Sequence, residues 1–181
     1  MRRRRIRCGG RPRGTASPRS RGGGGTVMHV SIVAVGKPGG LSPAIRDYEA
    51  RAARYWRFEA VEVAQARGRA AAEVMRKEAG SIRRRLRTGH LRVAVTRRGC
   101  RMSSPELARW LERLVSGPEP GVHFIIGGAF GLDARLREEC DLSLSLSPFT
   151  LPHDMARVVL TEQLYRAGPI LRREPYHKGT E

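Results

Sequence analysis

The sequence has little cysteine and no long apolar run. Its three cysteines, Cys8, Cys100 and Cys140, lie far apart, and none belongs to a Cys-x-x-Cys pair. This pattern favours neither a disulfide framework nor a zinc site, so we expect no bound metal and a reducing, cytoplasmic location. No stretch approaches the roughly 20 apolar residues that a membrane-spanning helix needs, so we expect no membrane association.

Acidic residues are also scarce, and residues 1–27 contain none, against nine arginines. The formal net charge is +18, and this segment and residues 28–181 each contribute half of it. A basic body favours a polyanionic partner, of which nucleic acid is the most obvious. The alternative is an arginine-rich codon bias, since arginine outnumbers lysine 32 to 3. Charge by itself leaves both interpretations open.

Residues 1–27 consist mostly of Arg, Gly, Pro and Ser, and offer almost nothing to bury. We expect this Arg/Gly-rich extension to be disordered. Its charged start is followed by no apolar segment of the kind that signal peptides have, so export is not expected. Two interpretations remain: an RNA-binding arm, or a segment upstream of a true start at Met28.

From Met28 onward, strand-like segments alternate with helix-like segments. Strands are expected over residues 29–35, 58–63, 91–95, 122–126 and 141–147. Helices are expected over residues 43–57, 69–87, 132–140 and 154–167, and after a Ser103–Glu106 capping box. Gly168-Pro169 is expected to end or kink the last helix. The alternation predicts a single α/β domain over residues 28–181, with a mostly parallel sheet flanked by helices.

A glycine-rich turn follows the fourth expected strand, in FIIGGAFGLD (124–133). Its spacing is Gly-Gly-x-x-Gly rather than Gly-x-Gly-x-x-Gly, and no acidic residue ends the next strand, so a dinucleotide site is disfavoured. Gly127 and Gly128 instead leave bare backbone at the carboxyl end of a strand. The loop SPFTLPH (147–153) follows the next strand. These loops offer no cluster of charges for a phosphate, which favours a neutral aromatic ligand with a sulfonium group.

Several segments together resemble one known family. They are VAVGK (33–37), RRGCRMSS (97–104), FIIGGAFGL (124–132), LSLSPFTLPHDMARVVLTEQLYRA (144–167) and EPYHKG (174–179). In this order they resemble the RlmH family, which are SPOUT-superfamily methyltransferases acting on N3 of a pseudouridine in 23S rRNA. The resemblance implies a deep trefoil knot near the C-terminus, a homodimer and S-adenosylmethionine as the methyl donor. The alternative is a catalytically weak RNA-binding or ribosome-assembly protein on the same fold.

The family's cofactor-binding positions match particular residues of this sequence. The resemblance implies that the methyl donor contacts Val95, Gly128, Ser147, Pro148, Phe149, Thr150, Leu151 and Pro152. This chain departs from the family pattern at Val95-Thr96, where Leu-Asp or Leu-Glu is frequent, and at Gly99-Cys100, where Gly-Lys is frequent.

Catalysis requires a group that takes the imide proton from the acceptor nitrogen or stabilises the resulting anion. The candidates are His177, Tyr176 and Arg157. Arg157 lies in an apolar stretch and needs a partner, either Glu162 or an RNA phosphate or imide anion. His153 is expected at the mouth of the site or bonded to a backbone carbonyl. Further interpretations are dimer packing for Tyr165 and Arg166, and an RNA-facing or merely solvated run of Arg83, Arg84, Arg85 and Arg87.

Overall fold

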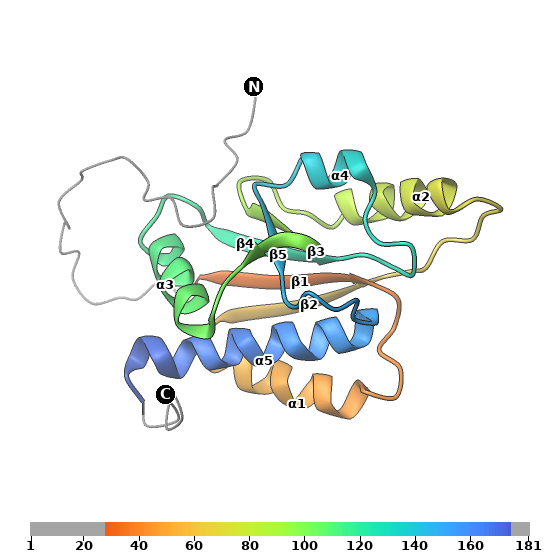
Figure 1. Cartoon of the computed structure of the whole chain (residues 1–181). Helices are drawn as coiled ribbons and strands as arrows, with labels where there is room; N and C mark the ends of the chain where they lie inside the picture. Colours follow the sequence, from red (N-terminus) through yellow and green to blue (C-terminus); the bar gives the residue numbers. More distant parts are fainter. Residues whose placement is uncertain (1–27, 175–181) are drawn as a thin grey trace.

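The computed structural model of the chain describes residues 28–174, and its centre is a five-stranded parallel sheet (Figure 1). The strand order is β2-β1-β4-β3-β5, and every neighbouring pair is parallel. The strands are β1 (His29–Val35), β2 (Arg57–Val63), β3 (Leu91–Arg101), β4 (Gly121–Ile126) and β5 (Leu142–Ser145). The predicted parallel α/β sheet is therefore confirmed.

Helices cover both faces of this sheet, as a parallel sheet requires. One face carries α1 (Ser42–Ala52), α3 (Ser104–Val115) and α5 (His153–Arg172). The other carries α2 (Ala71–Arg83) and α4 (Ala134–Glu138). Among the described helices, none is both long and apolar enough to cross a bilayer.

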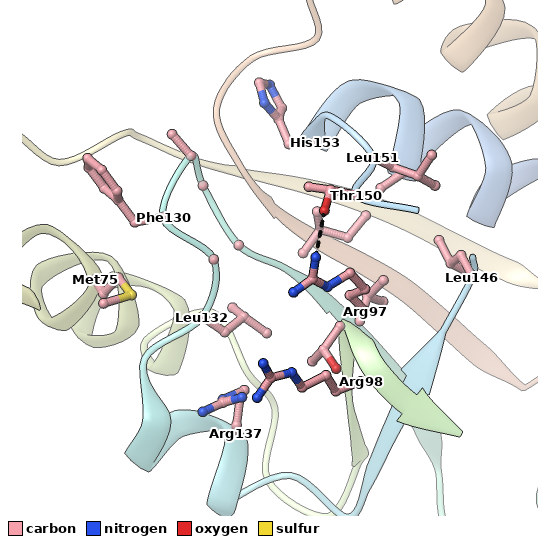
Figure 2. Close-up of a pocket in the computed structure, with 18 of the residues that line it drawn as sticks. Met75, Arg97, Arg98, Phe130, Leu132, Arg137, Leu146, Thr150, Leu151 and His153 are labelled. Atoms are coloured by element: carbon pink, nitrogen blue, oxygen red, sulfur yellow. Dashed lines mark hydrogen bonds between the residues drawn. The ribbon is translucent and has the colours of Figure 1, made fainter. Parts of the chain in front are cut away.

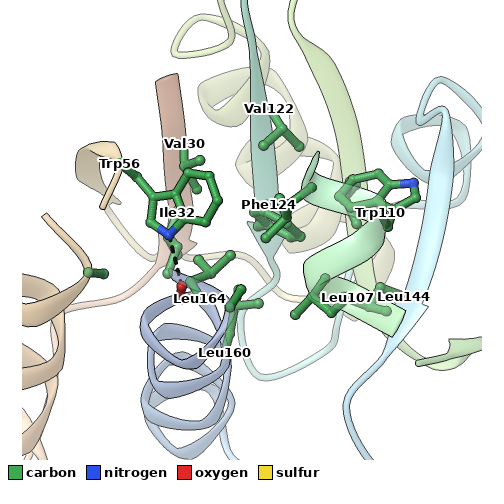
Figure 3. Packing of buried hydrophobic residues seen from close by; sticks show 14 of the residues in the cluster. Val30, Ile32, Trp56, Leu107, Trp110, Val122, Phe124, Leu144, Leu160 and Leu164 are labelled. Atoms are coloured by element: carbon green, nitrogen blue, oxygen red, sulfur yellow. Dashed lines mark hydrogen bonds between the residues drawn. The ribbon is translucent and has the colours of Figure 1, made fainter. Parts of the chain in front are cut away.

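Each face has its own apolar core. The larger core lies beneath α1, α3 and α5, where Phe124 of β4 meets the Trp110 ring with a centroid distance of 6.2 Å (Figure 3). In the same core the Trp56 indole nitrogen donates to the Leu164 carbonyl oxygen at 2.8 Å. A smaller core joins α2 and α4 to the opposite face of β1 and β4. Burial on both faces explains why β1 and β4 are almost wholly apolar in sequence.

Helix α3 begins as its sequence predicts. The Ser103 hydroxyl accepts the backbone N–H of Glu106, and the Glu106 carboxylate accepts the backbone N–H of Ser103 at 2.8 Å. This reciprocal capping satisfies two backbone donors that the first helical turn leaves without partners.

The last helix does not end at Gly168-Pro169, because α5 continues through both residues to Arg172. Gly168 packs against Tyr55 so closely that a Cβ would lie 2.2 Å from the ring. The Tyr55 hydroxyl also donates to the Glu174 carboxylate at 2.5 Å. Tertiary packing of the final turn therefore overrides the local helix-breaking tendency of the proline.

Strand β3 is longer than the predicted 91–95, and β5 is shorter than the predicted 141–147. Residues 91–94 pair with β4, while the later part of β3 pairs only with β5. Strand β3 therefore lies between β4 and β5, so the chain must cross β3 between these two consecutive strands. This crossing is consistent with the knotted C-terminal half that the family resemblance implies.

Candidate functional site

A cavity of about 590 Å³ lies where β3, β4 and β5 end (Figure 2). Its apolar wall is formed by residues such as Val95, Ile126, Leu132, Leu146 and Leu151. The carboxyl ends of parallel strands are the usual position of ligand sites in α/β proteins. The volume is within the range of small-molecule and cofactor pockets.

The glycine loop 127–131 forms one wall of this cavity with its backbone. A Cβ on Gly127 would lie 2.5 Å from the carbonyl carbon of Gly131, so no other residue fits there without moving the loop. Gly131 closes the turn with φ +82°, and its N–H donates to the Gly128 carbonyl at 2.9 Å. The bare backbone that the sequence predicts is therefore present.

The loop 147–152 forms the wall opposite the glycine loop. Ser147, Phe149, Thr150 and Leu151 line the cavity, together with Val95 and Gly128, so six of the eight predicted cofactor positions lie together. Pro148 and Pro152 are not among the lining residues. The Ser147 hydroxyl accepts the backbone N–H of Phe149 at 3.0 Å, which fixes the turn.

The two loops contain no cluster of charges, as expected, but the cavity has one from other elements. Arg97 and Arg98 of β3 and Arg137 of α4 all line it (Figure 2). Arg97 donates to the Thr150 hydroxyl at 3.2 Å, which joins β3 to the loop 147–152. The sequence did not reveal this cluster, because strand pairing brings Arg97 and Arg98 to the same cavity as Arg137 of α4. The one available signal was the Arg97-Arg98 pair before Gly99.

Glu78 of α2 is a second residue that sequence reasoning missed. Its side chain is buried directly behind the glycine loop, and a Cβ on Gly128 would lie 2.9 Å from Oε2. Oε1 accepts the backbone N–H of Ala66 at 3.2 Å, whereas Oε2 has no hydrogen-bond partner. Burial raises the pKa of this carboxyl, because a low-dielectric environment disfavours the charged form.

His153 is the first residue of α5, and it lies where both expectations for it placed it, at the cavity and beside a backbone carbonyl. It lines the cavity, and its Nε2 lies 3.5 Å from the Lys37 carbonyl oxygen. Two further residues that sequence reasoning missed contribute to the cavity: Met75 of α2 and the exposed Phe130 of the glycine loop.

Arg157 has other partners than Glu162. Its guanidinium is buried and donates to the Glu49 carboxylate at 2.8 Å and to the Glu62 carboxylate at 3.1 Å. It does not line the cavity. Glu162 instead pairs with Arg166 at 2.6 Å, one turn further along α5. The ion pairs of Arg157 join α5 to α1 and β2, which is a structural function.

Two arginines of the run proposed to face RNA form ion pairs within the chain. Arg83 pairs with Glu139 at 2.8 Å, and Arg87 pairs with Glu59 at 2.8 Å. Tyr165 is buried against the rings of Tyr48 and Tyr55 within the chain.

Two of the three catalytic candidates, Tyr176 and His177, lie outside the described residues. Residues 1–27 lie outside them as well. Within residues 28–174 there is no group of three His, Cys, Asp or Glu side chains arranged to hold a metal ion.

A family model described as "Predicted SPOUT methyltransferase" matches residues 28–177. The chain belongs to the SPOUT methyltransferase family. The matched segment begins at Met28 and includes both loops of the cavity.

Several relatives of this SPOUT chain have the name "Ribosomal RNA large subunit methyltransferase H". The protein from Gemmatimonas aurantiaca is 46% identical over 155 residues, covering 83% of this chain and 100% of the relative. The protein from Acetivibrio thermocellus is 40% identical over 159 residues, with the same coverage of both chains. This chain therefore spans the whole length of both relatives.

Proposed function

We propose that this chain transfers a methyl group from S-adenosylmethionine to N3 of a pseudouridine in 23S rRNA. The observation that carries the proposal is the cavity between the glycine loop and the loop 147–152, in a chain that is 46% identical to a protein named as a large-subunit rRNA methyltransferase. As the family resemblance implies, we also propose that the chain acts as a cytoplasmic homodimer.

The cavity walls fit the proposed methyl donor. Apolar side chains such as Val95 and Leu151 suit an aromatic base, and bare backbone at Gly127 and Gly128 offers N–H and C=O groups at close range. When bound, the sulfonium compound would supply an activated methyl group. Val95, Gly128 and the loop 147–152 would hold it at the strand ends. The tight packing of Gly127 on Gly131 would keep this wall preorganised.

The acceptor nitrogen must lose its proton before it becomes a nucleophile. We propose His177 as the group that accepts this proton or orients the substrate, with Tyr176 beside it. For Arg157 we propose a structural role in place of a catalytic one, because two carboxylates already hold its guanidinium. His153 lines the cavity and is the described histidine best placed to contact the substrate at its mouth.

Calorimetric titration with S-adenosylmethionine, followed by a methyl-transfer assay on ribosomes from a deletion strain, tests the proposal. The expected result is binding by the native chain, with one methyl group gained per 23S rRNA. His177→Ala should slow transfer and leave cofactor affinity nearly unchanged. Arg46→Ala, an exposed position on α1, is a control. Binding of the cofactor without methyl transfer would contradict the activity. Absence of cofactor binding would favour the ribosome-assembly alternative.

A further inference from the structure

Strand β3 interrupts its pairing with β5 at the cavity mouth. Val95 and Cys100 both pair with Leu144, so residues 96–99 form a bulge outside the ladder. Bulges redirect side chains and are frequent beside active sites. The bulge needs glycine at its end, because a Cβ on Gly99 would lie 2.4 Å from the carbonyl carbon of Leu144.

The bulge presents two arginines, and both are exposed. Arg97 and Arg98 line the main cavity with Arg137 of α4 (Figure 2). Arg98 and Arg137 also line a neighbouring cavity of about 360 Å³, so they stand between the two. Both residues are exposed to solvent, and their side chains point toward each other (Figure 2).

These three guanidinium groups have no carboxylate partner among the described residues, although Glu138 lines the neighbouring cavity. The hydrogen bond that joins Arg97 to Thr150 involves a neutral hydroxyl. In contrast, Arg83 and Arg157 each form ion pairs with two carboxylates. Clustered cations repel one another, and bound phosphates would relieve this repulsion through charge-assisted hydrogen bonds.

An exposed aromatic ring lies on the same rim. Phe130 is 56% exposed at the tip of the glycine loop, and it also lines the cavity. Aromatic side chains beside basic ones are the usual means of binding unpaired RNA, because bases stack on the ring while arginines contact phosphates.

We propose that Arg97, Arg98 and Arg137 bind the phosphodiester backbone beside the target nucleotide of an RNA substrate, with Phe130 stacking on an unpaired base. These four residues are the RNA rim of the cavity. This role of the RNA rim rests on the proposed function for the identity of the RNA. The binding of RNA by the rim can nevertheless be measured without methyl transfer. A base must leave its stack to reach the cavity, and the RNA rim would hold the strand on either side.

The test is a salt titration of RNA binding by the full chain, so that residues 1–27 contribute equally to every variant. The probe is a fluorescein-labelled 20-nucleotide oligouridylate, and binding is measured by anisotropy. The rim variant combines Arg97→Ala, Arg98→Ala and Arg137→Ala. The control variant combines Arg46→Ala, Arg109→Ala and Arg113→Ala, which removes three exposed charges from α1 and α3. Circular dichroism verifies that both variants are folded.

Each phosphate contact to single-stranded nucleic acid contributes about 0.7 to the slope of log affinity against log salt. The rim variant should therefore lower this slope by about 2, and the control variant by clearly less. Phe130→Ala should weaken binding at every salt concentration without changing the slope. S-adenosylmethionine affinity should stay within about twofold in the control variant. In the rim variant it should fall clearly less than RNA affinity, because only the Arg97–Thr150 hydrogen bond supports the loop 147–152.

Two outcomes would overturn the proposal. Equal slope changes in the rim and control variants would mean that overall charge, rather than this site, attracts RNA. A loss of S-adenosylmethionine affinity parallel to the loss of RNA affinity would place the arginines on the cofactor instead. If the native chain bound no S-adenosylmethionine, the proposed function would fail, yet the slopes would still decide whether the RNA rim exists.

Discussion

The two ends of the sheet use similar residues for opposite purposes. At the amino end, His29, His90 and His123 are all buried, and the His90 and His123 ring centroids are 4.9 Å apart. His123 accepts the backbone N–H of Arg87 at 2.9 Å and bonds to the Ser31 hydroxyl. This end is sealed by packing.

The carboxyl end is open and is formed by glycine and arginine. Gly121 at the amino end lets a histidine ring pack on the backbone, since a Cβ there would lie 2.5 Å from His90. Gly127 at the carboxyl end lets one turn of a loop pack on another and leaves a cavity beside it. The missing side chain thus allows close packing at Gly121 and leaves room for a ligand beside Gly127. The following predictions separate these two functions.

The largest effect is expected for Gly127→Ala. Its Cβ would lie 2.5 Å from backbone atoms of Gly131, so the glycine loop must move and lose its fit to the ligand. We expect S-adenosylmethionine affinity to fall at least about 100-fold, or about 2.7 kcal/mol, by calorimetry. Gly40→Ala is the control, because its Cβ would meet nothing within 4 Å. Equal affinity in both variants would show that the loop does not bind the ligand.

At the sealed end, Gly121→Ala should act on stability instead. Its Cβ would lie 2.4 Å from the His29 carbonyl oxygen, which forces β1 and β4 apart. Overpacking of this kind destabilises by about 2 to 3 kcal/mol, measured by urea unfolding. The affinity of the folded fraction for S-adenosylmethionine should stay unchanged. If affinity fell as it does in Gly127→Ala, the two ends would not be separate in function.

His123 should make stability dependent on pH. Burial, with the charges of His90, His29 and Arg87, lowers the pKa of His123 from 6.5 to about 4. A lowered pKa means that the stabilisation is complete above pH 6.5 and is lost as the pH falls toward 4. Between pH 7 and 4.5 His123 should remove about 2 to 3 kcal/mol of the unfolding free energy.

Urea unfolding of the native chain and of His123→Gln at pH 7 and 4.5 measures this contribution. The variant cannot titrate at this position, so its stability should depend less on pH. An identical pH dependence in the two proteins would remove His123 as the cause.

The smallest effect is expected for Glu78→Gln behind the glycine loop. The raised pKa of Glu78 implies that the charged form destabilises the fold as the pH rises above 4.5. Glutamine keeps an acceptor for the Ala66 N–H, so the variant should be more stable at pH 7 by about 1 kcal/mol or less. This gain should vanish near pH 4. A less stable variant at pH 7 would mean that the carboxylate has a partner that the structure does not reveal.

Local patterns in the sequence predicted the fold well. The β-branched run of β1 has the predicted bounds, 29–35, and the Ser103–Glu106 capping box starts α3. These features depend on residues close together in the chain, so periodicity and capping chemistry are enough to find them.

Features that depend on long-range pairing were not predictable in the same way. Arg157 pairs with Glu49, 108 residues earlier, whereas sequence reasoning looked one turn along the same helix. The bulge at 96–99 follows from the register of β3 against β5, which no local pattern specifies. Gly168-Pro169 reads as a break until the Tyr55 ring is seen beside Gly168. In each case tertiary contacts decide the outcome.

The most direct measurement is mass analysis of 23S rRNA from a strain that lacks this chain, with and without the restored gene. The proposal predicts that one pseudouridine loses a methyl group in the deletion strain and regains it with the native chain, but not with Gly127→Ala. An unchanged set of methylated nucleotides in the deletion strain would contradict the proposed activity.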